Sequence, residues 1–121
     1  MRFFIVRVAA WTALTCTVFA ISACRHKERT PVERGFGVFM RSCAGCHGPD
    51  ARGTHPPGFS VPPRDLTDPE LQARLGDAAL RETIHFGKGQ MPPFGAALAD
   101  TEVSDVVLYV RSLNRLHSAG R

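Results

Sequence analysis

Two cysteines and a histidine stand close together in the chain, in the segment Cys43-Ala44-Gly45-Cys46-His47. Each of two thiols at this spacing can add to one vinyl group of a haem, and the adjoining imidazole can then bind the iron. A thiol–disulfide site needs only the two cysteines, and a zinc site needs a fourth ligand at a workable distance. The histidine therefore favours covalent attachment of one haem c, with a zinc or thiol-redox domain as the alternative.

Residues 1–23 predict an export signal of the lipoprotein type. They carry two arginines near the start and continue as an uncharged, mostly apolar run that ends in small residues just before Cys24. This end resembles the lipobox at which bacterial lipoproteins are cut and lipidated, so we expect a lipid on Cys24. The same run could stay uncut as a membrane anchor, or be cut to leave a freely soluble product. The first two outcomes tether the protein to a membrane in the periplasm.

The remainder of the chain is small and nearly neutral. The 121 residues include 15 Lys and Arg against 11 Asp and Glu, and two of the arginines lie in the signal, which leaves a net charge of +2. Two haem propionates would offset this charge, and the basic residues are not clustered, so no nucleic-acid binding is expected. Cys16 would leave with the signal, so Cys43 and Cys46 would be the cysteines left without a lipid, and no disulfide framework is expected.

The pattern of apolar residues predicts an all-α domain. We expect a polar tether over 24–32, the domain over 33–116 and a C-terminal tail over 117–121. Such a domain is near the lower size for a self-sufficient core, so a buried haem would form part of that core and the apoprotein should fold poorly.

About four helices are predicted within this domain. The first begins near Val32 or Glu33 and runs into the cysteine motif, and a loop rich in Gly and Pro follows. Two short helices are expected over 69–75 and 78–86. The clearest helix runs from 100 to about 113, where apolar residues recur at helical spacing.

Three segments together resemble a class I c-type cytochrome of the short bacterial monohaem kind. The first contains Gly35, Phe39 and the Cys-Ala-Gly-Cys-His-Gly motif; the second is Gly-Lys-Gly-Gln-Met-Pro-Pro-Phe at 87–94; the third is the stretch 105–113. The resemblance spans about 33–113. It implies helices packed around one covalently attached haem, with the first and last helices crossing at Gly35 and Tyr109.

The resemblance implies His47 and Met91 as the axial ligands of the iron, and the placement of the methionines agrees. Met40 lies on the same helix as the cysteine motif and cannot easily reach across the ring, so we expect it to pack in the core. Met91 lies in a loop shaped by glycines and prolines. His85 is the rival ligand, and His55 is a second one; either would give bis-histidine ligation with a lower potential.

The contacts around the ligands are also implied by the resemblance. In the family a proline carbonyl accepts the second ring N–H of the histidine ligand, which here implies Pro62 or Pro63. Pro56 and Pro57 are further alternatives. Arg64 is expected to meet a haem propionate, with an ordinary exposed arginine as the other interpretation.

The function implied is electron transfer, with both axial ligands bound in the oxidised and the reduced protein. The partners would be one redox protein that donates electrons and another that accepts them. Two alternatives stay open at this point. The domain could be a fixed subunit of a larger respiratory oxidase or dehydrogenase, or it could be a haem enzyme or sensor with an open iron position.

Overall fold

The structure, a computed structural model, describes residues 28–54 and 56–119, the last five of them by their backbone only. The predicted signal over 1–23, the predicted lipid site Cys24 and the alternative ligand His55 lie outside the described residues. Within the described part of the chain, the regular structure consists of five helices without a strand. The predicted helical content is therefore confirmed.

The first described helix, α2 (Pro31–Ser42), begins one or two residues earlier than predicted. The Thr30 hydroxyl accepts a hydrogen bond from the Glu33 N–H, and the Glu33 carboxylate accepts one from the Thr30 N–H. This reciprocal capping box satisfies N–H groups at the helix start, and a proline in the first turn already has a helical φ. The short helix α3 (Ala44–His47) follows directly and carries most of the cysteine motif.

Two further helices match their predicted ranges closely. Helix α4 (Pro69–Arg74) is capped by the Asp68 carboxylate, which accepts from the Glu70 N–H at 2.9 Å. Helix α5 (Asp77–Phe86) ends at Gly87, whose φ of 75° lies in the region that favours glycine.

Helix α6 (Asp100–Ala119) is longer than predicted, since the expected end was near residue 113. No proline or glycine interrupts the chain between residue 113 and Gly120. A helix can continue as long as its residues tolerate helical geometry and no residue breaks it.

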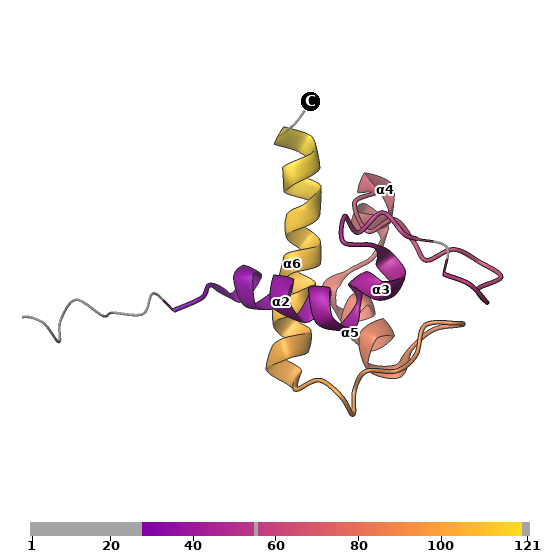
Figure 1. The fold of residues 1–121 in the computed structure, drawn as a ribbon. Coiled ribbons are helices and arrows are strands. Elements are labelled where there is room, and N and C mark those ends of the chain that lie inside the picture. Colours follow the sequence, from indigo (N-terminus) through magenta and orange to yellow (C-terminus); the bar gives the residue numbers. More distant parts are fainter. Residues whose placement is uncertain (1–27, 55, 120–121) are drawn as a thin grey trace, which may run out of the picture.

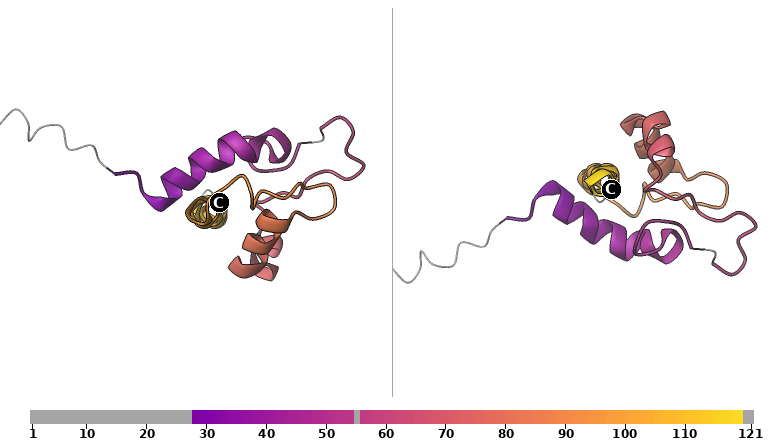
Figure 2. Two further views of the ribbon diagram at one scale, coloured as in Figure 1. Left: turned by 90° about the horizontal axis from the view of Figure 1, so that it is seen from below. Right: turned by 90° about the horizontal axis from the view of Figure 1, so that it is seen from above.

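The core lies where α2 and α6 cross at a steep angle (Figure 1), with α4 and α5 on one side of the crossing (Figure 2). A Cβ atom added to Gly35 would lie 2.0 Å from the Asp105 carbonyl oxygen and 2.9 Å from the Tyr109 Cβ. The rings of Phe39 and Tyr109 pack with centroids 5.2 Å apart. The predicted crossing at Gly35 and Tyr109 is confirmed. The fully buried side chains beside it are Phe39, Val106 and Val107.

Ion pairs fix the direction of this crossing. The Arg34 guanidinium donates to both carboxylate oxygens of Asp105, at 2.7 and 3.1 Å, and Asp105 is buried. Arg41, in the last turn of α2, pairs with Glu102 near the start of α6. A bidentate arginine pair holds its geometry better than a single contact does, so α6 is held at a fixed angle beside the cysteine motif.

We predict that Gly35→Ala destabilises the protein by about 3 kcal/mol or more, because the added methyl meets a backbone carbonyl that cannot rotate away. Denaturant unfolding of the holoprotein measures the effect. Gly37→Ala is the matched control in the same helix, since a Cβ there meets nothing within 4 Å and alanine is the better helix former. Equal stability of the two variants would contradict the close crossing.

Candidate functional site

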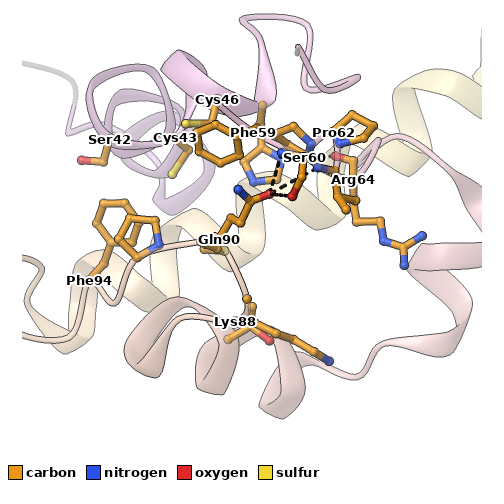
Figure 3. Close-up of a pocket in the computed structure, with 17 residues that line it drawn as sticks. Ser42, Cys43, Cys46, Phe59, Ser60, Pro62, Arg64, Lys88, Gln90 and Phe94 are labelled. Atoms are coloured by element: carbon orange, nitrogen blue, oxygen red, sulfur yellow. Dashed lines mark hydrogen bonds between the residues drawn. The ribbon is translucent and has the colours of Figure 1, made fainter. Parts of the chain in front are cut away.

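The cysteine motif borders a cavity of about 460 Å³, which is within the usual size range of cofactor and ligand sites. The cavity lies between the α2–α3 region and two loops, one after α3 and one after α5 (Figure 3). Most of its lining is apolar. The lining residues are Ser42, Cys43, Cys46, His47, the segments 59–64 and 88–92, Thr83 and Phe94.

Local hydrogen bonds orient the motif. The N–H groups of Cys46 and His47 both donate to the Cys43 carbonyl, so the helical turn continues from α2 into α3. The chain after the motif folds back, and the Thr54 hydroxyl donates to the Cys46 carbonyl at 2.6 Å. Cys43 and Cys46 both line the cavity, and Figure 3 shows their side chains close to one another at its edge.

The two cysteines are free thiols rather than a disulfide. Burial raises the pKa of the Cys43 thiol to about 11, so this thiol is protonated at neutral pH. Thiol–disulfide enzymes instead lower the pKa of the attacking cysteine. Within residues 28–54 and 56–119, no three His, Cys, Asp or Glu side chains gather closely enough to hold a metal ion. The burial of Cys43 therefore disfavours the thiol-redox alternative.

The His47 ring is held in one tautomer. Its Nδ1 lies 3.1 Å from the Arg64 carbonyl oxygen, and because a carbonyl can only accept, Nδ1 carries the proton. Burial lowers the pKa of His47, and the bond to the Arg64 carbonyl opposes this effect. A neutral imidazole with a protonated Nδ1 has a free lone pair on Nε2, which is the form that binds a metal.

The structure places a carbonyl other than that of a predicted proline against the His47 ring. The carbonyl that meets the ring belongs to Arg64, and not to Pro62 or Pro63 or to the earlier alternatives Pro56 and Pro57. Any residue offers a backbone carbonyl, so the path of the loop decides which one faces the ring. Pro62 and Pro63 still line the cavity, and so does the exposed Arg64.

Met91 lies in the lining of the same cavity, contributed by the loop after α5. The N–H of Met91 donates to the Lys88 carbonyl at 3.0 Å, and the Lys88 N–H donates to the Met91 carbonyl at 3.1 Å. A Cβ on Gly87 would lie 2.5 Å from the Met91 carbonyl oxygen, so only glycine allows this tight turn. The Phe94 N–H then bonds the Ile84 carbonyl and fixes the loop to α5.

Among the competing side chains that the structure describes, His85 and Met40 do not line the cavity. His85 is exposed, packs edge-on against Phe86 at 4.6 Å between ring centroids, and lies close to Gly95. Met40 is 41% exposed, so the expectation that it fills the core is wrong. Met40 shares the helical spacing of Phe36 and Phe39 on α2, but of these three side chains Phe39 is the one that is buried.

A covalently attached haem fits this donor set. Two free thiols face an apolar cavity, a neutral imidazole adjoins them, and a thioether comes from a separate loop. Sequence reasoning did not single out Gln90, whose side chain bonds the loop on the other side of the cavity. The only hint in the sequence is a polar residue directly before Met91.

Comparison with known proteins agrees with this chemistry. The model of the family "Cytochrome C oxidase, cbb3-type, subunit III" matches residues 30–110. The chain is 39% identical over 82 residues to the cbb3-type cytochrome c oxidase subunit FixPc of Rhizobium leguminosarum bv. viciae, which covers 67% of this chain and 27% of that protein. It thus spans about a quarter of the length of the first curated relatives it matches.

Two other similarities cover nearly the whole of the matched protein. Cytochrome c6 of Bumilleriopsis filiformis is 34% identical over 83 residues, or 67% of this chain and 90% of that protein. The solved structure of the KustC0563 c-type cytochrome superposes with a TM-score of 0.56 at 30% identity, and covers 65% of this chain and 95% of that one. Such proteins carry haem c. The chain belongs to the c-type cytochrome family and has the all-α fold of that family.

Proposed function

We propose that the protein transfers electrons with one haem c, attached through Cys43 and Cys46 and ligated by His47 and Met91. The observation that carries this proposal is the shared lining of one cavity by the two thiols, the imidazole and the thioether. His47 lies in α3 and Met91 lies in the loop after α5, so the two side chains can approach one planar group from separate elements. Ligation on both faces leaves no position for a substrate or gas, which disfavours the enzyme and sensor alternatives.

The haem would supply a reversible one-electron change. The chain's own residues set how easily that change occurs. A thioether ligand favours the reduced state more than a second imidazole does, and an apolar lining raises the potential further. The Arg64 carbonyl holds the His47 ring in orientation, while we propose that the Arg64 guanidinium pairs with a propionate. Pro62 and Pro63 would contact the ring edge from the same loop.

We further propose that the protein acts in the periplasm of a bacterium, tethered to a membrane through a lipid on Cys24 or through an uncut N-terminal segment. The support is the sequence of residues 1–24. No helix within residues 28–54 and 56–119 has the length and hydrophobicity needed to cross a bilayer. A tether would raise the local concentration of a donor and an acceptor held in the same membrane.

Cys24→Ala tests the tether. We expect the variant to lose its lipid and to move from the membrane to the soluble fraction, because a lipid chain supplies most of the membrane affinity. Intact-mass spectrometry and cell fractionation measure both effects. Cys16→Ala is the matched control, since this cysteine lies within the predicted signal. A wild-type protein without lipid would contradict the lipoprotein prediction, and a variant that stays in the membrane would favour the uncut anchor.

A second candidate function is a fixed subunit of a larger oxidase. The matching family model and the FixPc relative, both named for cbb3-type oxidases, favour it. The nearly full-length match to cytochrome c6 instead favours a separate carrier. Detergent extraction distinguishes the two: a fixed subunit purifies in a constant ratio with its complex, whereas a carrier purifies alone.

The proposed cofactor is tested on the purified protein. We expect a haem stain that survives denaturing electrophoresis, and a peptide containing residues 43–46 whose mass is increased by one haem. The ratio of iron to protein should be one. A ratio of two, or a peptide of unmodified mass, would contradict the proposal.

A further inference from the structure

Two loops that border the cavity come from distant parts of the sequence, and one side chain joins them. The Gln90 Oε1 atom accepts hydrogen bonds from the Ser60 N–H at 3.1 Å, the Val61 N–H at 3.2 Å and the Ser60 hydroxyl at 3.2 Å. Figure 3 shows the amide of Gln90 reaching across to Ser60. Partners 29 and 30 residues away in sequence thus converge on a single oxygen.

On one side, this link is rigidly connected to Met91. Gln90 directly precedes Met91 in a turn closed by two hydrogen bonds between Lys88 and Met91. Gly87 and Gly89 adopt φ values of 75° and 60° in that turn, a conformation that other residues rarely take. A turn of this kind moves as a unit, so a displacement of Gln90 displaces Met91 as well.

On the other side, the link reaches the loop that orients His47. Ser60 and Val61 stand a few residues before Arg64, whose carbonyl meets the His47 Nδ1. The Gln90 amide therefore connects the loop that holds one proposed iron ligand to the loop that carries the other.

The geometry of the link argues for a specific contact rather than a chance one. Gln90, Ser60 and Val61 are all exposed, so packing does not fix this side chain. Ordering an exposed glutamine costs rotamer freedom, which a single hydrogen bond to solvent-accessible atoms would barely offset. Two backbone donors and a hydroxyl on one oxygen offset it more fully.

We infer that Gln90 is a positioning residue, which clasps the two loops and so keeps Met91 from being displaced by ligands in solution. This inference rests on the proposed ligation of the iron by Met91. Gln90 itself need not touch the haem iron. Its effect is on how readily the loop after α5 separates from the loop at 59–64.

The test is the binding of imidazole to the oxidised holoprotein, followed by loss of the sulfur-to-iron absorption band. Gln90→Leu keeps the length of the side chain but removes the acceptor. We expect it to bind imidazole about tenfold more tightly than wild type, the factor that corresponds to about 1.4 kcal/mol. Gln90→Glu keeps an acceptor oxygen at the same place and should stay close to wild type.

Two further variants separate the clasp from general effects. Ser60→Ala removes the hydroxyl donor alone and leaves the two backbone N–H groups bonded to Gln90, so imidazole affinity should rise less than in Gln90→Leu. Glu82→Leu replaces an exposed residue of α5 that does not line the cavity and should behave as wild type. Amide hydrogen exchange gives an independent measure: the Val61 N–H should exchange faster in Gln90→Leu but not in Gln90→Glu.

The outcomes separate this inference from the proposed function. If wild type shows the sulfur-to-iron band and Gln90→Leu binds imidazole no more tightly, the inference is overturned and the ligation by Met91 stands. If wild type lacks the band, the proposed ligation fails, and the inference fails with it. Equal tightening in Gln90→Leu and Glu82→Leu would also overturn it, because the effect would then be general destabilisation.

Discussion

Met91→Ala is expected to abolish the sulfur-to-iron absorption band of the oxidised protein and to lower its midpoint potential. The fall should be on the order of 0.1 V, within the range of about 0.8 V that axial ligands span in haem proteins. Alanine has no donor atom, so the thioether preference for the reduced iron is lost. Optical spectra and a redox titration measure both effects.

Met40→Ala is the matched control for this prediction. Met40 is a methionine of the same domain, but it is exposed on α2 and does not line the cavity. Its replacement should leave the band and the potential unchanged. An unchanged spectrum in Met91→Ala, or a lost band in Met40→Ala, would remove Met91 as the ligand.

The second large effect is expected from the double variant Cys43→Ser/Cys46→Ser. It should carry no covalent haem, because serine hydroxyls do not form the two thioether bonds. It should also fold poorly. Without a retained haem, an apolar cavity of about 460 Å³ would stay empty, and an unfilled cavity of that size lowers the stability of a protein core. A haem stain after denaturing electrophoresis and circular dichroism measure these two losses.

The single variants refine that result. Cys43→Ser and Cys46→Ser should each keep one attachment and a weaker stain. Cys16→Ala, within the predicted signal, should stain as wild type does. Covalent haem in the double variant would contradict the assignment of the attachment site.

Local patterns in the sequence were sufficient to predict most of the fold. Residues at helical spacing predicted α6, and capping residues with a following proline predicted α4. Gly35 was interpretable because a close helix crossing demands a residue without a side chain, and the structure places Asp105 and Tyr109 against it. Each of these features requires a particular residue type at a particular place, and such a requirement can be read from the sequence.

The predictions were wrong where the residue type alone does not determine the local structure. Helix α6 continues past residue 113 because no proline or glycine stands between that residue and Gly120. Met40 is an apolar residue of a type common in protein cores, but it is exposed because Phe39 occupies the helix crossing. The acceptor for His47 is a backbone carbonyl, which every residue offers, and the loop path selects Arg64. Gln90 was missed because its partners are about 30 residues away in sequence.

If one cavity holds a haem with ligands on both faces, the domain can carry electrons without binding a substrate. The most direct test is a redox titration of the purified wild-type protein followed by its absorption spectrum. We predict one reversible one-electron transition, with a low-spin six-coordinate spectrum in both states and the sulfur-to-iron band when oxidised. A high-spin spectrum with an open coordination position, or a second transition of equal size, would contradict the account.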